Sequence, residues 1–194
     1  MKKRLLNHKL TDKQCRDLWL FAQDSKCKGW NEPYNPELPV EYEKFKINTI
    51  QQNPIQKFLN SNEYDILVLE RSCDLNGGSI YLDELFKYRR DIQENEILRT
   101  AQDNIELGST LSFSVDTFKK VVFAYSKKTQ SSASYLPIVE VCLQTIAHEF
   151  DQKKMLMTFI GCESNSPEDR IQQQDIKNVI EKTLYNQDVT ISIQ

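Results

Sequence analysis

Residues 64–79, which read YDILVLERSCDLNGGS, decide the fold of this chain. The unbroken apolar run from Ile66 to Leu69 predicts a buried strand. A short polar loop follows it and closes on a glycine pair, Gly77 and Gly78, before a long segment with helical periodicity begins. In open sheets of this kind, ligands bind in the crevice beyond the carboxyl ends of the strands. We therefore expect a functional site in residues 70–79 and in the loops beside them.

The rest of the chain alternates in the same way between apolar strands and helices. Strands are predicted near residues 43–50, 110–115, 120–125, 155–160 and 189–193. Helices are predicted near 55–59, 80–99 with a break near Asp91, and 134–150, and another should begin at Ser166 and Pro167. This order predicts a three-layer α/β/α domain over residues 41–194, with a mostly parallel, mixed sheet. Right-handed crossovers place the loops after residues 69, 125 and 160 at one rim.

The N-terminal part of the chain has a different pattern. Thr11 and Gln14 have the spacing of a capping box, which predicts a helix over about residues 12–25. Residues 29–39 contain three of the six prolines and read as a connector. We expect residues 1–40 to form a helix and a Pro-rich connector, packed on the main domain or tethered to it. Trp30 and Tyr34 read as anchors, or as part of a docking surface for a protein partner.

The composition bounds the function. The 194 residues carry 28 acidic and 25 basic side chains, mixed along the chain, so nucleic acid is an unlikely partner. No apolar run approaches the roughly 20 residues that cross a bilayer, so no membrane association is expected. The five cysteines are widely spaced and there are only two histidines. This predicts a cytoplasmic protein with reduced thiols, no metal site and no cofactor.

Charged and nucleophilic residues cluster on the predicted loops. Three charged residues follow the predicted strand at 66–69, namely Glu70, Arg71 and Asp74. They could form an acid/base cluster, although charges grouped on a loop are usually solvated. Cys73 and Cys162 could be nucleophiles near helix starts, but neither has a histidine close by in the sequence. We expect both to be ordinary thiols.

Two segments of the chain resemble the macro domain family. The run from Tyr64 through Gly78 is similar to that family's Asp-Ala-Ile-Val-Asn-Ala-Ala-Asn and its following glycines. Residues 159–167, FIGCESNSP, resemble the family's phosphate-loop segment, in which a strand leads to a Gly-x-Gly-x-x-Gly motif and a helix. Gly108 lies in a segment with the character of the family's central region. The resemblance covers roughly residues 43–193.

The resemblance implies a domain that binds ADP-ribose or a related nucleotide-like ligand. Three departures mark the pocket as divergent. The family's asparagines fall on Leu69 and Ser72, and Glu163 falls on its second phosphate-loop glycine. The acidic residue with which the family binds the adenine amine falls near Asn53 or Pro54, and neither of these has a carboxylate. Carried onto this sequence, the ligand contacts are expected from Asn53, Ser72, Leu75, Gly77, Gly78, Ser79, Gly161, Cys162, Ser164, Asn165 and Ser166.

Two other functions remain open. The chain could be a hydrolase acting on ADP-ribosylated substrates, among them ADP-ribosylated proteins, with Glu70, Asp74 or Glu163 as the acid or base. It could also be an interaction protein that keeps the fold without a ligand, since Leu69 and Glu163 do not suit a diphosphate. If the side chain of Leu69, Arg71 or Glu163 fills the crevice at the ends of the strands, the hypothesis of an interaction protein is favoured.

Overall fold

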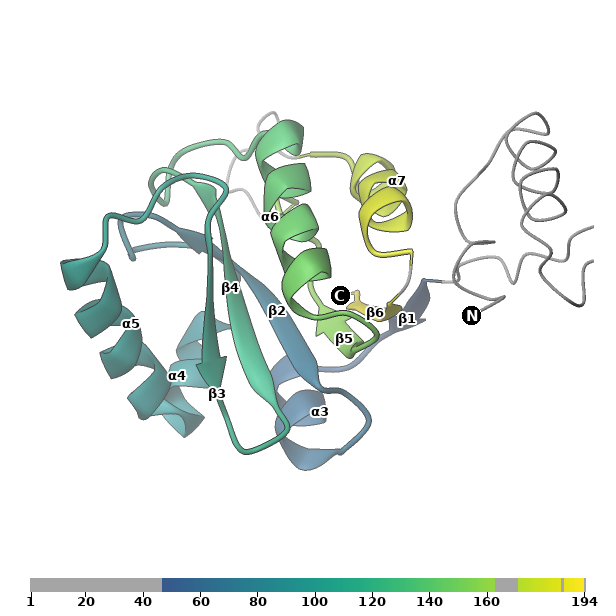
Figure 1. Cartoon of the computed structure of the whole chain (residues 1–194), viewed down its shortest axis with the longest axis horizontal. Coiled ribbons are helices and arrows are strands. Elements are labelled where there is room, and N and C mark those ends of the chain that lie inside the picture. Colours follow the sequence, from purple (N-terminus) through teal and green to yellow (C-terminus); the bar gives the residue numbers. More distant parts are fainter. Residues whose placement is uncertain (1–46, 163–170, 186, 194) are drawn as a thin grey trace, which may run out of the picture. The chain divides into compact units, whose positions relative to one another are not determined.

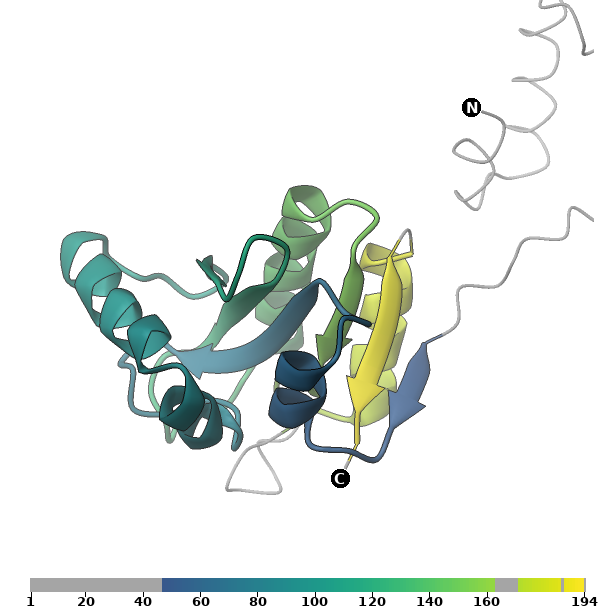
Figure 2. The same cartoon turned by 90° about the horizontal axis from the view of Figure 1, so that it is seen from below.

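The computed structural model describes residues 47–162, 171–185 and 187–193. They form a six-stranded sheet with the order β1-β6-β5-β2-β4-β3. All neighbouring strands are parallel except β3, which runs antiparallel to β4 at one edge. Helices cover both faces of the sheet, α6 and α7 on one and α3, α4 and α5 on the other (Figures 1 and 2). The predicted α/β fold with a mostly parallel, mixed sheet is confirmed for these residues.

The elements lie close to the predicted ranges. The strands are β1 Asn48–Ile50, β2 Ile66–Ser72, β3 Thr110–Ser114, β4 Lys120–Lys127, β5 Lys154–Met157 and β6 Asp188–Ser192. The helices are α3 Pro54–Asn60, α4 Leu82–Tyr88, α5 Arg90–Gln102, α6 Leu136–Glu149 and α7 Gln173–Thr183. The break predicted near Asp91 is confirmed, because Arg89 leaves the helical conformation between α4 and α5.

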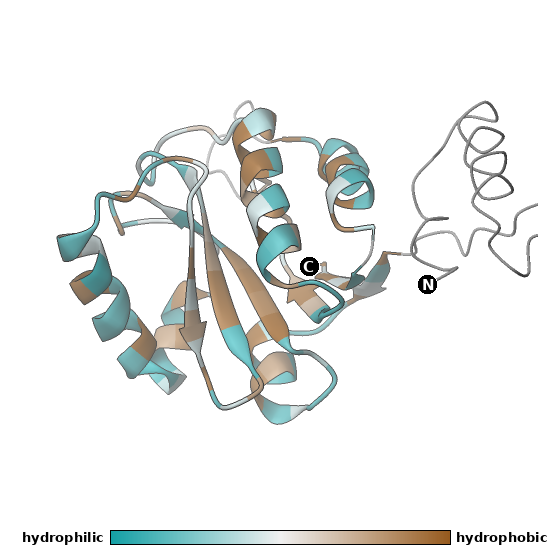
Figure 3. Cartoon of the chain, in the orientation of Figure 1, coloured by the Kyte–Doolittle hydropathy of each residue, from teal (hydrophilic) through white to brown (hydrophobic). Residues whose placement is uncertain are grey.

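Alternation along β2 divides the core into two clusters. Ile66 and Val68 pack with residues of α6 and α7, whereas Leu67 and Leu69 pack with residues of α3, α4 and α5. Successive strand side chains point to opposite faces, so a strand covered on both sides is apolar throughout. The middle parts of β2 and β4 are accordingly hydrophobic, and most of α5 is hydrophilic (Figure 3).

The parallel strands bring their carboxyl ends to one edge of the sheet. The described loops at this edge, called the rim below, are residues 51–53, 73–81, 103–109, 128–135, 158–162 and 171–172. The predicted meeting of the loops that follow β2, β4 and β5 is therefore confirmed. A ligand site of an open α/β sheet belongs at this edge.

Two boundaries differ from the sequence-based expectation. β2 does not end at Leu69 but continues to Ser72, and Glu70 and Arg71 are 0% and 5% exposed. The interpretation of these charges as solvated loop residues is wrong, because each is buried in an ion pair. The last helix begins at Gln173, with Gln172 extended before it, and so does not run continuously from Ser166. The predicted N-terminal helix and connector lie outside the described residues.

A buried lysine holds the end of α3. Lys119 is 7% exposed, and its ammonium donates to the carbonyl oxygens of Phe58, at 3.0 Å, and Ser61. Replacement by Met keeps the length of the side chain but leaves both carbonyls without this donor. We expect Lys119→Met to lower the free energy of unfolding by about 2 kcal/mol, as for hydrogen bonds from charged groups.

Urea unfolding followed by circular dichroism measures this difference. The matched control is Lys128→Met, which changes an exposed lysine and should alter stability by no more than about 0.5 kcal/mol. Equal losses in the two variants would contradict the capping role.

Candidate functional site

The loop after β2 is closed by its own hydrogen bonds. The Ser72 hydroxyl accepts from the Gly77 N–H at 2.8 Å and lies 2.6 Å from an Asp74 carboxylate oxygen. Asp74 in turn accepts from the backbone and side-chain amides of Asn76. Partial burial opposes its ionisation, but the hydrogen bonds from Ser72, Asn76 and the Gln130 backbone keep the pKa of Asp74 below its ordinary value. Asp74 is thus an ionised, exposed carboxylate that organises this loop.

The glycine pair packs tightly against the chain itself. A Cβ at position 78 would lie 2.3 Å from the Glu70 carbonyl oxygen, and the backbone there has a φ of +140°. A Cβ at position 77 would lie 2.7 Å from the Cα of Gln130. The loop folds back so far that Gly78 pairs with Arg71 in an antiparallel bridge. Packing therefore accounts for both glycines, and their contact with a ligand stays a prediction.

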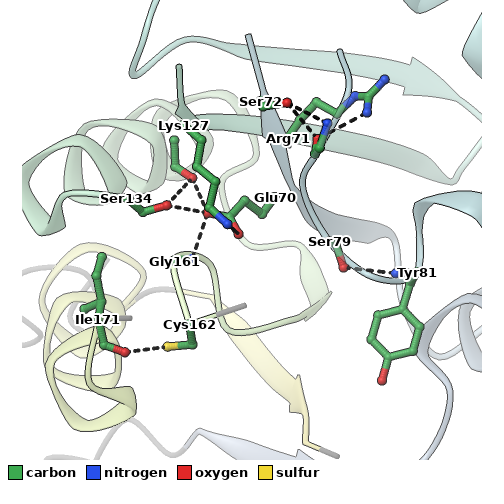
Figure 4. A network of polar contacts seen from close by, with 12 residues as sticks. Glu70, Arg71, Ser72, Ser79, Tyr81, Lys127, Ser134, Gly161, Cys162 and Ile171 are labelled. Atoms are coloured by element: carbon green, nitrogen blue, oxygen red, sulfur yellow. Dashed lines mark hydrogen bonds and ion pairs between the residues drawn. The ribbon is translucent and has the colours of Figure 1, made fainter. Parts of the chain in front are cut away.

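A buried carboxylate lies where the loops after β2, β4 and β5 meet. Glu70 Oε1 accepts from the hydroxyls of Ser126 and Ser134, the latter at 2.7 Å. The same oxygen accepts from the Gly161 N–H at 3.0 Å. Glu70 Oε2 lies 3.1 Å from the Lys127 ammonium. Figure 4 shows Lys127, Ser134 and Gly161 converging on Glu70 from separate parts of the chain.

A register shift in the sheet creates this arrangement. Arg71 pairs with Tyr125, but the next residue, Ser72, pairs with Lys127, so Ser126 has no partner in β2. An extra residue of this kind bends a strand and redirects its side chains. As a result, the Ser126 hydroxyl and the Lys127 ammonium both reach Glu70 on β2.

The base of the loop after β5 is fixed at Gly161. Ile171 N–H donates to the Gly161 carbonyl at 3.1 Å, and the Cys162 thiol lies 3.1 Å from the Ile171 carbonyl. Gly161 has a φ of +83°, and a Cβ there would lie 2.7 Å from Ile171. Glu163, Ser164, Asn165 and Ser166 lie outside the described residues, so their expected roles stay predictions.

Arg71 forms a second buried pair on the opposite face of the sheet. Its Nε and Nη2 donate to the two carboxylate oxygens of Glu96 at 2.8 and 2.9 Å. Its Nη1 donates to the Gly77 carbonyl, and its guanidinium lies over the Phe86 ring. Tyr125 also donates to Glu96, and burial together with this carboxylate raises the pKa of Tyr125. Arg71 thereby ties the glycine turn to α5.

A carboxylate that sequence reasoning missed lies beside Asn53. The Asn53 side-chain oxygen caps α3 by accepting from the backbone of Ile55 and Gln56, and its amide donates to Glu84. The Gln56 side chain donates to the other Glu84 oxygen at 3.0 Å. Glu84 lies 31 residues from Asn53 in the chain, in the first turn of α4. Only the fold brings the two together.

The remaining predicted residues of the first loop have mixed positions. Ser79 is buried, and its N–H donates to the Glu70 carbonyl at 2.8 Å. Leu75 has a φ of +60° and packs against the core cluster of α3, α4 and α5, to which the fully buried Leu69 also belongs. Burial, followed by the nearby Asp74 carboxylate, raises the pKa of Cys73, so this thiol is protonated at neutral pH. The structure brings Glu70, Ser72, Gly77, Gly78, Ser79 and Gly161 together and places Asn53 in a separate cluster with Glu84.

An open pocket of about 350 Å³ lies at the opposite edge of the sheet, between the ends of α6 and α7. It is lined by His148, Asp151, Lys182, Tyr185 and their neighbours. In the part of the chain that the structure describes, no group of three or more His, Cys, Asp or Glu could hold a metal ion. None of the described helices is long and apolar enough to cross a membrane.

Solved structures share this arrangement of strands and loops. The macrodomain of Thermus aquaticus DarG superposes with a TM-score of 0.59 at 13% identity, over 76% of this chain and 96% of that one. The chain has a macrodomain fold. The macrodomain of Mycobacterium tuberculosis DarG gives a TM-score of 0.57 at 15% identity, over 77% and 98% of the two chains. The predicted resemblance to the macro domain family is therefore confirmed at the level of the fold, and the low identities show that the chain is divergent.

One of the similar solved structures contains a ligand. Thermosipho africanus DarTG in complex with ADP-ribose matches with a TM-score of 0.55 at 12% identity, over 68% of this chain and 38% of that one. No family model matches the sequence, and no curated protein matches it. The macrodomain likeness is thus carried by the three-dimensional arrangement.

Proposed function

We propose that this chain is a binding module for ADP-ribose or a related nucleotide-like ligand, with a divergent pocket at the rim. The observation that carries the proposal is the macrodomain fold, shared with a DarTG structure that holds ADP-ribose. The loops after β2, β4 and β5 meet at the edge where open α/β sheets bind ligands. The ligand itself, or the same group on an ADP-ribosylated protein, is the expected partner.

The Asn53 cluster is the proposed place for the adenine end of the ligand. Both side-chain roles of Asn53 are already used, since its oxygen caps α3 and its amide donates to Glu84. Among the residues that the structure describes, each Glu84 oxygen accepts one hydrogen bond and has capacity for another. Glu84 therefore supplies the carboxylate that the resemblance implies and that position 53 lacks.

Isothermal titration with ADP-ribose tests the proposal. We expect heat of binding to the full chain, and about tenfold weaker binding in Glu84→Gln, which corresponds to roughly 1.4 kcal/mol. Ribose 5-phosphate, which has no adenine, should bind the two proteins alike. Glu94→Gln is the control, because Glu94 is an exposed acid of α5 that pairs only with the exposed Arg90 among the contacts described.

An absence of heat at millimolar ADP-ribose would contradict the proposal that ADP-ribose is the ligand. If Glu84→Gln and the unchanged chain bound ADP-ribose with equal affinity, ADP-ribose would remain the proposed ligand. Glu84 would then not be the residue that accepts a hydrogen bond from the adenine.

The hydrolase alternative depends on Asp74, Glu70 and Glu163. Asp74 is exposed and has a lowered pKa, so it suits a base better than an acid. Glu70 is fully buried and paired with Lys127, which suits a structural role. Catalysis by any of the three stays a prediction, to be checked by release of ADP-ribose from a modified protein.

A specific observation favours a second function. Where the resembling family has two alanines, this chain has Glu70 and Arg71, and both are buried in ion pairs at the rim. A chain that has filled these positions with structural pairs could serve as an interaction protein that retains the fold. Protein capture with no ADP-ribose binding would support this function over the first.

A further inference from the structure

The groups around Glu70 are of the kind that bind oxyanions. One is the Gly161 N–H, and two are the hydroxyls of Ser126 and Ser134. The fourth is the Lys127 ammonium, which is 3% exposed. Backbone N–H groups, hydroxyls and an ammonium are the donors that proteins use for phosphate groups. In this chain, the N–H and the two hydroxyls donate to one oxygen of Glu70, and the ammonium lies beside the other. Figure 4 shows Lys127, Ser134 and Gly161 around Glu70.

The geometry shows that these donors converge on one small volume. Three hydrogen bonds end on the single atom Glu70 Oε1, and the ammonium lies 3.1 Å from Oε2. A carboxylate oxygen has about two lone-pair directions, so three donors on one oxygen exceed its ordinary capacity. A phosphate group has more oxygens and spreads the same donors over several of them.

The donors come from parts of the chain far apart in sequence. Gly161 is 91 residues from Glu70, and Ser134 is 64 residues from it. Three of the four donor groups are held by contacts that do not involve the Glu70 carboxylate: Ser126 and Lys127 lie at the irregular end of β4, and the Gly161 carbonyl accepts from the Ile171 N–H. The donor set should therefore survive removal of the carboxylate.

We propose that Ser126, Lys127, Ser134 and Gly161 form an oxyanion site that the native chain fills with the Glu70 carboxylate, and that the vacated site binds a phosphate group. In the native chain, Glu70 therefore excludes a phosphate from the Gly161 N–H. This inference goes beyond the proposed ADP-ribose function, because it concerns an isolated phosphate group and requires no nucleoside.

Inorganic phosphate and acetate are the probes. Glu70→Ala removes four heavy atoms and leaves a space of the size of acetate. Glu70→Gly removes the Cβ as well and leaves a larger space. We expect the melting temperature of the full-length variants to rise by about 5 °C in saturating phosphate or acetate relative to chloride at equal ionic strength. The unchanged chain should show no such difference. Glu70→Gln, which fills the site without charge, should also show none.

A second substitution tests the donors. In Glu70→Ala/Ser134→Ala, phosphate should bind at least tenfold more weakly than in Glu70→Ala, measured by titration calorimetry. The control Glu70→Ala/Ser131→Ala changes an exposed serine of the same loop and should bind as Glu70→Ala does.

Three results would overturn the proposal. The first is a folded Glu70→Ala or Glu70→Gly chain that responds equally to phosphate and chloride. The second is unchanged phosphate affinity after loss of Ser134. The third is failure of both single variants to fold even in phosphate, because the donors would then require the tethered carboxylate. Binding of ADP-ribose by the native chain bears on the proposed function alone and leaves these results unaffected.

Discussion

Replacing Arg71 by Met should lower the free energy of unfolding by about 3–5 kcal/mol, the usual cost of breaking a buried ion pair from one side. Arg71 is 5% exposed and forms a bidentate pair with Glu96, which is fully buried. Without the guanidinium, the Glu96 carboxylate stays buried and keeps the Tyr125 hydroxyl as a donor. Urea unfolding measures the loss, and a fall in melting temperature of roughly 10 °C should accompany it.

The double variant Arg71→Met/Glu96→Met separates the charge from the packing. It replaces both charges with apolar side chains and should recover to within about 2 kcal/mol of the unchanged chain, since buried pairs often contribute little net stability. The control is Arg90→Met, which breaks an exposed pair with Glu94 and should cost no more than about 0.5 kcal/mol. If the double variant lost as much free energy of unfolding as the two single variants together, Arg71 and Glu96 would not be energetically coupled.

Replacing Gly78 by Ala should destabilise the domain by more than about 3 kcal/mol, because steric overlap and backbone strain act together. The new Cβ would lie 2.3 Å from the Glu70 carbonyl and 2.8 Å from the Arg71 Cα, and a φ of +140° is strained for any residue with a Cβ. The Glu70 and Arg71 backbone atoms cannot move away from the new Cβ as the end of a flexible side chain could. The turn would therefore separate from β2 and break the bond from Ser79 N–H to the Glu70 carbonyl.

Denaturant unfolding and amide hydrogen exchange test this prediction. Exchange should quicken at Ser79 and at Ser72, whose N–H groups close the turn onto β2 and Gly77. Asn76→Ala, an exposed change in the same turn, is the control and should cost no more than about 1 kcal/mol. A Gly78→Ala chain as stable as Asn76→Ala would show that the turn moves freely.

The sequence predicted the strands and the rim well because their signals are local. A run such as Ile66 to Leu69 reads as a buried strand whatever it packs against, and its end predicts where loops meet. The prediction ended β2 too early because Glu70 and Arg71 are charged. Charges at the end of an apolar strand normally mark solvent, and their buried partners, Lys127 and Glu96, lie far along the chain.

The candidate site shows the same division. The glycines at 77 and 78 could be singled out because a turn signal lies in adjacent residues, and Ser72 followed from the resemblance to the macro domain family. Glu84 could not, because its contact with Asn53 depends on the packing of α4 beside the start of α3.

The sequence by itself determined the order of the elements, the edge at which the loops meet and the glycines that its turns require. These follow from periodicity and backbone sterics within short segments. The tertiary structure alone decided what Glu70 does, because a carboxylate takes its character from its surroundings. The shifted register at Ser126 and the approach of Gly161 give it donors from three parts of the chain. They turn a charge that would be solvated in a loop into the buried centre of the rim.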